Sequence, residues 1–137
     1  MILTDTGPLV ALFDPADQDH GRCVERLRSI REPLVTTVPV LTEGFHLLSP
    51  GSRGAEALMR FVADGGVGLW FLNEASLARA FELMQRYADM HMDLADASLV
   101  TAAEALGSRR IFTLDRKDFS TYRIRRGHQH LSFEPVP

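Results

Sequence analysis

The chain has 137 residues, of which 45% are hydrophobic and 24% are charged, and its net charge is −3. This length and composition predict one domain, residues 1–137, that can bury a core of its own. The single cysteine, Cys23, excludes an intramolecular disulfide and is expected to be a small helix residue rather than a nucleophile. No apolar run approaches the ~18 residues of a membrane span, and the N-terminus lacks a signal-peptide pattern. The sequence therefore predicts a cytoplasmic protein with no membrane partner.

Short apolar or β-branched runs alternate with amphipathic stretches along the chain. Strands are expected at Ile2–Thr4, Leu34–Val38, Val67–Leu72, Arg109–Leu114 and, as a last edge strand, Leu131–Val136. Helices are expected at Leu9–Phe13, His20–Ile30, Pro39–Leu48, Gly54–Ala63, Asn73–Ala88 and Leu94–Leu106, with one more turn at Asp118–Tyr122. This alternation predicts an α/β fold, a three-layer α/β/α sandwich with a mostly parallel central sheet of four to five strands.

The helix expected at Leu94–Leu106 carries two aspartates at its start. Asp93 is a good N-cap, and Gly107 is a good residue to end the helix. Asp93, Asp96 and Val100 are spaced i, i+3 and i+7, so both carboxylates lie on one side of the helix beside an apolar neighbour. This placement favours a functional role over a purely solvated face.

Three further acids, Asp5, Glu43 and Asp115, come from other elements of the chain. Asp5 and Asp115 each follow a strand, and sites in open parallel sheets form at the carboxyl ends of strands. Asp5 has the alternative role of capping the helix that follows. Glu43 shares a helix face with Val40 and Leu47, so its burial would require a cation, a donor or a metal as partner. A solvated surface glutamate is the alternative reading of Glu43.

Asp5, Glu43, Asp96 and Asp115 come from four separate elements, and their convergence would be costly without a cation. Two carboxylates about 5 Å apart repel by roughly 3 kcal/mol at an effective dielectric constant near 20. Oxygen ligands without a Cys or His set indicate magnesium, with manganese as a substitute, rather than zinc. Such a site can activate water for hydrolysis of a phosphodiester. Spacing alone does not establish that the four acids meet.

Basic residues are concentrated late in the chain, although the whole protein is slightly acidic. The segment from Arg109 to Arg126 has seven basic residues and two acids, a local balance of +5. This segment is either a solvated surface or a track for phosphates beside a metal site. Arg116 and Lys117 adjoin Asp115 and are the candidates for contacts with RNA phosphates.

Four stretches, MILTDTGPLVAL, TEGFHLL, MDLADASLVTAAEALG and IFTLDRKDF, resemble in that order the acidic motifs of PIN-domain ribonucleases, especially the VapC-type toxins of type II toxin-antitoxin systems. The resemblance covers essentially the whole chain. It implies that Asp5 and Asp96 are the principal metal ligands, that Glu43 assists them, and that Asp115 completes the acidic pocket. Thr113 would orient a ligand, while Asp93 lies where the family pattern varies and is either an additional acid or a cap.

The same resemblance implies a Mg²⁺-dependent endoribonuclease that cleaves single-stranded or loop regions of RNA and acts as a toxin. It further implies a homodimer and a cognate antitoxin whose tail fills the acidic groove. Two alternatives within the fold are a noncatalytic PIN-like module that binds RNA or a partner, and an RNA-processing nuclease without a toxin role. A flavodoxin-like phosphoacceptor that uses Asp5 as nucleophile is disfavoured, because the only lysine, Lys117, follows Asp115 rather than ending a separate strand.

Overall fold

The computed structural model describes all 137 residues, and its centre is a five-stranded sheet in the order β3-β2-β1-β4-β7. All four neighbouring pairs of strands are parallel. The strands of this sheet are β1 (Ile2–Thr4), β2 (Leu34–Thr36), β3 (Gly68–Leu69), β4 (Arg110–Phe112) and β7 (Glu134–Pro135). The predicted parallel sheet of four to five strands is therefore confirmed.

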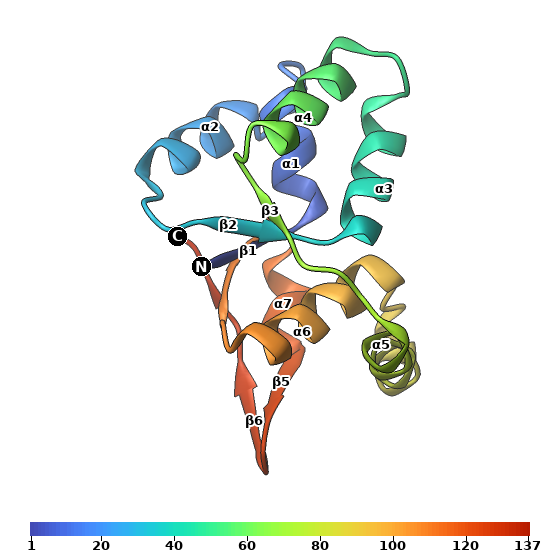
Figure 1. Ribbon diagram of the computed structural model, residues 1–137. Helices are drawn as coiled ribbons and strands as arrows, with labels where there is room; N and C mark the ends of the chain where they lie inside the picture. Colours follow the sequence, from blue (N-terminus) through green and yellow to red (C-terminus); the bar gives the residue numbers. More distant parts are fainter.

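Helices cover both faces of the sheet and complete the three predicted layers (Figure 1). The helices are α1 (Thr6–Phe13), α2 (His20–Ser29), α3 (Val38–Leu48), α4 (Arg53–Ala63), α5 (Glu74–Arg86), α6 (Leu94–Leu106) and α7 (Arg116–Thr121), with a 3-10 turn at Ala88–Met90. Helices α1, α2 and α4 lie on one side of the sheet, and α5, α6 and α7 lie on the other (Figure 1). None of these helices has both the length and the apolar character that a bilayer crossing requires.

The core follows the alternation of side chains along each strand. Leu3 and Ile111 belong to the larger apolar cluster, which includes the buried residues of α6. Their strand neighbours Ile2 and Phe112 point to the opposite face and pack in a second cluster with Cys23 of α2. The central strands β1, β2 and β4 are therefore covered on both faces, as expected of parallel strands, whereas the edge strands β3 and β7 are partly exposed.

Two of the strands pass almost directly into helices through polar capping residues. The Asp5 carboxylate, just after β1, caps α1 by accepting a hydrogen bond from the Thr6 amide. Thr37, just after β2, caps α3 through its hydroxyl. Thr37 also shares a buried hydroxyl pair with Ser98 of α6, 2.6 Å apart, and this pair ties the start of α3 to α6. The N-termini of α1, α3 and α6 consequently gather near one edge of the sheet.

The C-terminal region differs from the sequence prediction. The single edge strand expected at Leu131–Val136 is wrong, because β6 (Gln129–Ser132) and β7 are separate and pair with different partners. Strand β6 forms an antiparallel hairpin with β5 (Arg123–Arg126), which the sequence did not predict. The buried Phe133 stands between β6 and β7 and packs edge-on against Phe119, with ring centroids 5.2 Å apart. This anchor redirects the chain from the projecting hairpin back to the sheet (Figure 1).

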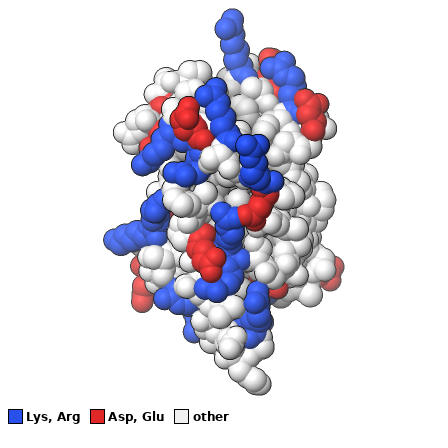
Figure 2. Space-filling model, turned by 90° about the vertical axis from the view of Figure 1, so that its left-hand side faces the viewer, with Lys and Arg blue, Asp and Glu red and all other residues white.

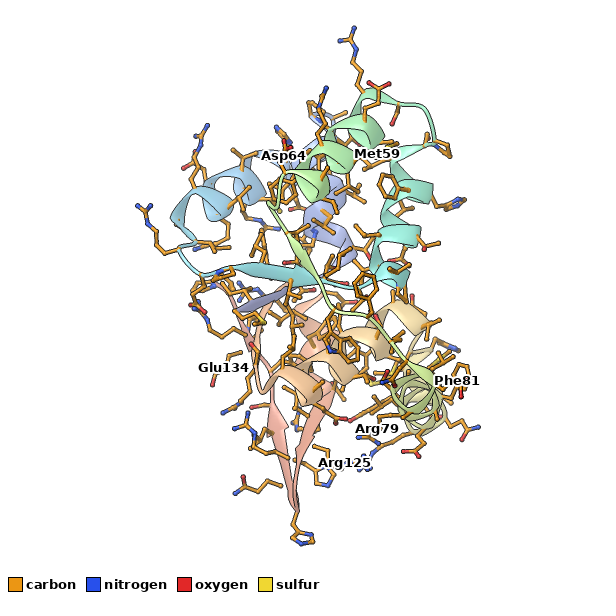
Figure 3. All side chains as sticks on the ribbon, in the orientation of Figure 1. Met59, Asp64, Arg79, Phe81, Arg125 and Glu134 are labelled. Carbon is orange, nitrogen blue, oxygen red and sulfur yellow. The ribbon has the colours of Figure 1, made fainter.

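Glu104 of α6 fastens both α5 and the hairpin to the central helix. Its two carboxylate oxygens accept from Nε and Nη2 of Arg79, at 2.9 and 3.0 Å. The oxygen that accepts from Nη2 also accepts from the Arg125 amide at 2.7 Å. Figure 3 labels Arg79 beside α5 and Arg125 beside the hairpin. Three elements that are distant in sequence thus meet at one carboxylate.

Candidate active site

Asp5 is the most deeply buried of the predicted site acids, with 7% of its surface exposed. One carboxylate oxygen accepts from the Thr6 amide at 2.8 Å, and the other accepts from the Thr113 hydroxyl at 2.7 Å. The predicted capping role is therefore present, but it uses only part of the hydrogen-bonding capacity of this carboxylate. Asp5 is held at the carboxyl end of β1 by its amide, which donates to the Phe112 carbonyl of β4.

Thr113 links Asp5 to the segment that follows β4. Its hydroxyl donates to Asp5 and accepts from the amide of Asp115 at 2.9 Å. The exposed Asp115 in turn caps α7 by accepting from the Asp118 amide at 3.1 Å. One hydroxyl therefore fixes both Asp5 and the Asp115 backbone, and the ligand-orienting role of Thr113 stays a prediction.

Asp96 lies in the first turn of α6, and its carboxylate accepts from the Tyr122 hydroxyl at 2.8 Å. Tyr122 is fully buried against Tyr87 and Phe119, so its hydroxyl has little freedom to leave. Asp93 is exposed and caps α6 by accepting from the Asp96 amide at 2.8 Å. The capping interpretation of Asp93 therefore accounts for its position.

Glu43 lies on α3, at the border between the buried and exposed faces of that helix. The buried face consists of Val40, Leu41, Gly44 and Leu48, whereas Leu47 is 58% exposed. The apolar face expected around Glu43 is thus wrong at Leu47, because α3 is rotated to turn that side chain outward. The half-buried Glu43 carboxylate makes no hydrogen bond or ion pair, and its charge acts on Asp5.

The pKa values of the two inner carboxyls are raised by their surroundings. The pKa of Asp5 is raised from 3.8 to about 6, chiefly by burial and to a smaller extent by the charges of Glu43 and Asp115, while the hydrogen bonds from Thr113 and Thr6 oppose the rise. Burial, with the charges of Asp5, Asp93 and Asp115 adding to it, raises the pKa of Asp96 from 3.8 to about 8, although the hydrogen bond from Tyr122 lowers it. The predicted acids thus lie close enough to repel one another.

No cation of the protein compensates this repulsion, because none of the ion pairs in the structure involves Asp5, Glu43, Asp96 or Asp115. The Thr6 hydroxyl beside Asp5 is also buried without a hydrogen-bond partner. No three Asp, Glu, His or Cys side chains are grouped tightly enough to enclose a metal ion directly. Magnesium commonly binds through only one or two carboxylates and keeps several waters, so the oxygen donors around Asp5 and Asp96 fit this ion.

The two basic candidates next to Asp115 lie on α7. Arg116 and Lys117 are both exposed; Arg116 donates to the Val136 carbonyl at 3.1 Å, and the Lys117 ammonium has no partner. Sequence reasoning missed two groups at the site, the Tyr122 hydroxyl and the unpaired Thr6 hydroxyl. Thr6 could have been noticed as a hydroxyl directly after Asp5, but Tyr122 follows an ordinary turn and carried no signal.

No protein-family model matches the chain. The chain is 32% identical over 124 residues to ribonuclease VapC26 of Mycobacterium tuberculosis strain H37Rv, with 89% of this chain and 92% of VapC26 covered.

Two solved structures share the fold. The crystal structure of M. tuberculosis VapC20, a toxin that cleaves the sarcin-ricin loop, superposes with a TM-score of 0.78 at 23% identity over 85% of this chain and 92% of VapC20. The VapBC2 complex of Rickettsia felis, bound to a DNA fragment from its promoter, gives 0.67 at 14% identity over the whole of both chains. The identity to VapC26 over nearly the full length of both proteins shows that this chain belongs to the VapC family of PIN-domain ribonuclease toxins.

Proposed function

We propose that the protein is a Mg²⁺-dependent endoribonuclease that cleaves single-stranded or loop regions of RNA and acts as the toxin of a toxin-antitoxin pair. The observation that carries the proposal is the pair of inner carboxyls, Asp5 and Asp96, whose pKa values are raised and which have no cationic partner. A site that concentrates negative charge without compensation is suited to a divalent cation. The ribonuclease name of VapC26 and the RNA-cleaving title of VapC20 support RNA as the substrate.

Each residue of the site would have a distinct part in this reaction. Asp5 and Asp96 would hold the Mg²⁺ ion, for which Mn²⁺ could substitute, and Glu43 and Asp115 would hold water molecules around it. When bound, the ion would supply a Lewis acid that activates water and offsets charge on the phosphodiester. Thr113 keeps Asp5 oriented through their 2.7 Å hydrogen bond, and Tyr122 does the same for Asp96. Arg116 and Lys117 would contact phosphates of the RNA.

The partners and setting follow from the same proposal. The VapBC2 complex supports a cognate antitoxin as partner, which would block the acidic site, and we also expect a homodimer. Residues 1–137 would form a single PIN-like domain acting in the cytoplasm, where RNA and antitoxin are both present.

The proposal is tested by incubating the purified protein, free of antitoxin, with a pool of structured and unstructured RNAs. Cleavage is expected with Mg²⁺ or Mn²⁺, and it should disappear with a chelator or in Asp96→Asn. The matched control is Asp64→Asn, because Asp64 is an exposed acid at the end of α4, on the far side of the fold (Figure 3). A folded wild-type protein that leaves every RNA intact in Mg²⁺ would contradict the proposed activity and favour a noncatalytic binding module.

A further inference from the structure

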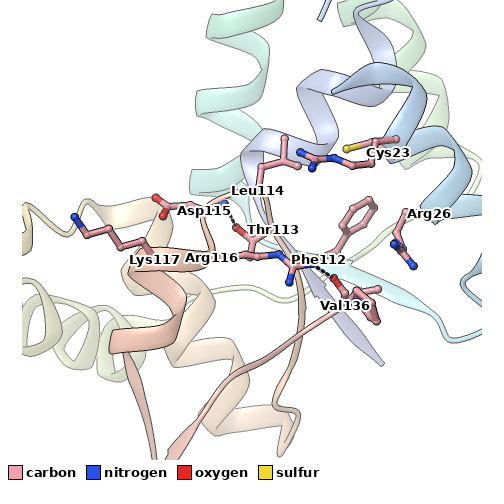
Figure 4. A pocket seen from close by; sticks show the side chains of 11 residues that line it. Cys23, Arg26, Phe112, Thr113, Leu114, Asp115, Arg116, Lys117 and Val136 are labelled. Atoms are coloured by element: carbon pink, nitrogen blue, oxygen red, sulfur yellow. Dashed lines mark hydrogen bonds between the residues drawn. The ribbon is translucent and has the colours of Figure 1, made fainter. Parts of the chain in front are cut away.

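A cavity of about 330 Å³ lies between α2 and the segment that follows β4, beside the end of the chain (Figure 4). Its lining has two different parts. The floor is apolar and is formed by the buried side chains of Cys23, Phe112 and Val136. The rim is cationic and is formed by Arg22, Arg26, Arg116 and Lys117. None of the residues that close the floor belongs to the acidic site described above.

The positive charge of the rim is largely uncompensated. Arg26 and Lys117 make no side-chain hydrogen bond or ion pair, and Arg116 donates only to the Val136 carbonyl. Arg22 alone is paired, with Asp19, and its side chain remains 66% exposed. Asp115 is the only acidic side chain in the lining, which also includes Pro137, the last residue of the chain. The face that bears α2 and the chain termini is correspondingly rich in basic side chains (Figure 2). An anionic ligand would supply the charge that this rim lacks.

The floor is suited to a flat, uncharged group rather than to a second anion. Phe112 and Val136 expose only 4% and 6% of their surfaces, so they contribute a narrow apolar strip, and the partly buried Leu114 extends it. Burial raises the pKa of the Cys23 thiol, which keeps it neutral under ordinary conditions. An apolar floor with a few convergent charged groups is the usual composition of a small-ligand site, and the volume is at the lower end of the range for such sites.

The cavity adjoins the acidic site through shared residues. Thr113, which donates to Asp5, and Asp115 both contribute to the lining. Figure 4 shows Asp115 at one end of this lining, with Phe112 and Arg26 toward the other. An RNA strand that is bound at the acidic site could therefore continue into the cavity without leaving the surface of the protein.

We propose that this cavity is a subsite for one nucleotide of the RNA, next to the phosphodiester that is cleaved. The base lies against Leu114 and the exposed edges of Phe112 and Val136, while a neighbouring phosphate contacts Arg26 and Arg116. A nucleotide unites the two kinds of group that the lining requires, an aromatic ring and an anion. This inference rests on the proposed ribonuclease function and adds a specificity-determining site to it.

The first test measures binding of a short single-stranded RNA in chelator, where no cleavage occurs, to the wild type, Arg26→Gln and Arg116→Gln. The matched control is Arg28→Gln, which removes the same charge from the exposed side of the same helix. We expect about tenfold weaker binding for each cavity variant, a salt dependence reduced by about one phosphate contact, and no comparable change in the control. Equal losses in all three variants would overturn the subsite, because only general attraction would remain.

The second test places a single abasic residue at each position of the oligonucleotide in turn. At one position close to the cleavage site, loss of the base should weaken wild-type binding about tenfold, the scale of one base contact. In Arg26→Gln, loss of the same base should have a smaller effect, because the base and its neighbouring phosphate bind together. If removal of a base and Arg26→Gln weaken binding additively at every position of the oligonucleotide, a joint site for base and phosphate is refuted.

Cleavage assays separate this inference from the proposed function. If the wild type cleaves RNA in Mg²⁺ and Arg26→Gln matches Arg28→Gln in both KM and binding, the subsite is wrong and the nuclease stands. If the wild type cleaves nothing but binds RNA through the cavity, the subsite stands and the nuclease fails. If the cavity variants bind RNA normally but lose binding to an acidic peptide such as oligoglutamate, the cavity is a protein-docking site and the inference is overturned.

Discussion

Asp96 is the residue at which the folded state is most sensitive to pH. Its pKa rises from 3.8 to about 8 on folding, so the folded protein holds a proton that the unfolded chain releases between these values. Stability of the metal-free protein should therefore fall as the pH rises from about 4 to about 8. Asp5, with a pKa raised to about 6, contributes in the same direction, by about 3 kcal/mol at most.

Asp96→Asn should consequently stabilise the metal-free protein at high pH. The amide has the shape of the carboxyl but cannot ionise, so at pH 8.5 the variant should be more stable by roughly 2–4 kcal/mol, with allowance for solvent near this half-buried group. At pH 4 the two proteins should be nearly equal. Urea unfolding in chelator at both pH values measures the difference. If Asp96→Asn is less stable than the wild type at both pH values, Asp96 supports the fold itself and its charge is not the dominant effect on stability.

The hydrogen bond from Tyr122 should influence the pH at which the Asp96 carboxyl ionises. The Tyr122 hydroxyl donates to the carboxylate at 2.8 Å and lowers the pKa of Asp96, against the larger effect of burial. Tyr122→Phe keeps the ring packing but should raise this pKa by up to about one unit, the scale of one hydrogen bond to a charged group. The pH profile of RNA cleavage should move upward accordingly. An unchanged profile with lower activity would assign Tyr122 a packing role only.

At the scale of elements, the attachment of the hairpin and α5 depends on Glu104. The Glu104 and Arg79 side chains are 12% and 16% exposed, and the Arg125 amide shares the same carboxylate. Glu104→Gln should destabilise the protein by about 2–4 kcal/mol, because the poorly solvated Arg79 loses the more buried of its two counterions. Glu82→Gln is the control: Glu82 pairs with the same arginine but is 63% exposed, so the cost should stay below about 1 kcal/mol.

Hydrogen exchange locates the effect of the Glu104 change. The Arg125 amide should exchange faster in Glu104→Gln than in the wild type, while the amides of β1 and β4 should change only as far as global stability does. If amide exchange is accelerated uniformly across the chain, Glu104 supports the whole fold rather than the junction of α5, α6 and the hairpin.

The parallel sheet and its helices were predictable because their signals are local. An apolar strand, a capping residue and an amphipathic helix succeed one another along the chain, and Asp93 and Gly107 bound α6 as expected. The β5-β6 hairpin was missed because its residues are basic and polar, with few apolar side chains to mark a strand; its turn depends on Gly127 at φ +61°. Its position depends on Glu104 and Phe133, which are distant contacts that no local pattern records.

The site was predictable to the extent that its acids follow strands or begin helices. That rule placed Asp5, Asp96 and Asp115 near one edge of the sheet, where their charges act on one another. The rule does not apply to side chains that are brought to the site by tertiary packing. Tyr122 reaches Asp96 across 26 residues of sequence, and Arg26 and Arg116 line one cavity because Cys23 of α2 packs in the same apolar cluster as Phe112 of β4.

At the scale of the whole molecule, the fold collects negative charge at one edge of the sheet and leaves the acids without protein cations. We propose that Asp5 and Asp96 hold a divalent ion there. Because the pKa of Asp96 is about 8, binding at neutral pH must displace its proton. Binding should therefore be accompanied by proton release, and this release should depend on Asp96.

The most direct test is calorimetric titration of the wild type with Mn²⁺ at pH 7, repeated in buffers that differ in ionisation enthalpy. About one proton should be released per ion bound at pH 7 and almost none at pH 9, where Asp96 is already ionised. Asp96→Asn should bind the ion far more weakly and release no proton from this position. Binding at pH 7 without proton release, or equal binding by Asp96→Asn, would contradict a metal site at Asp96.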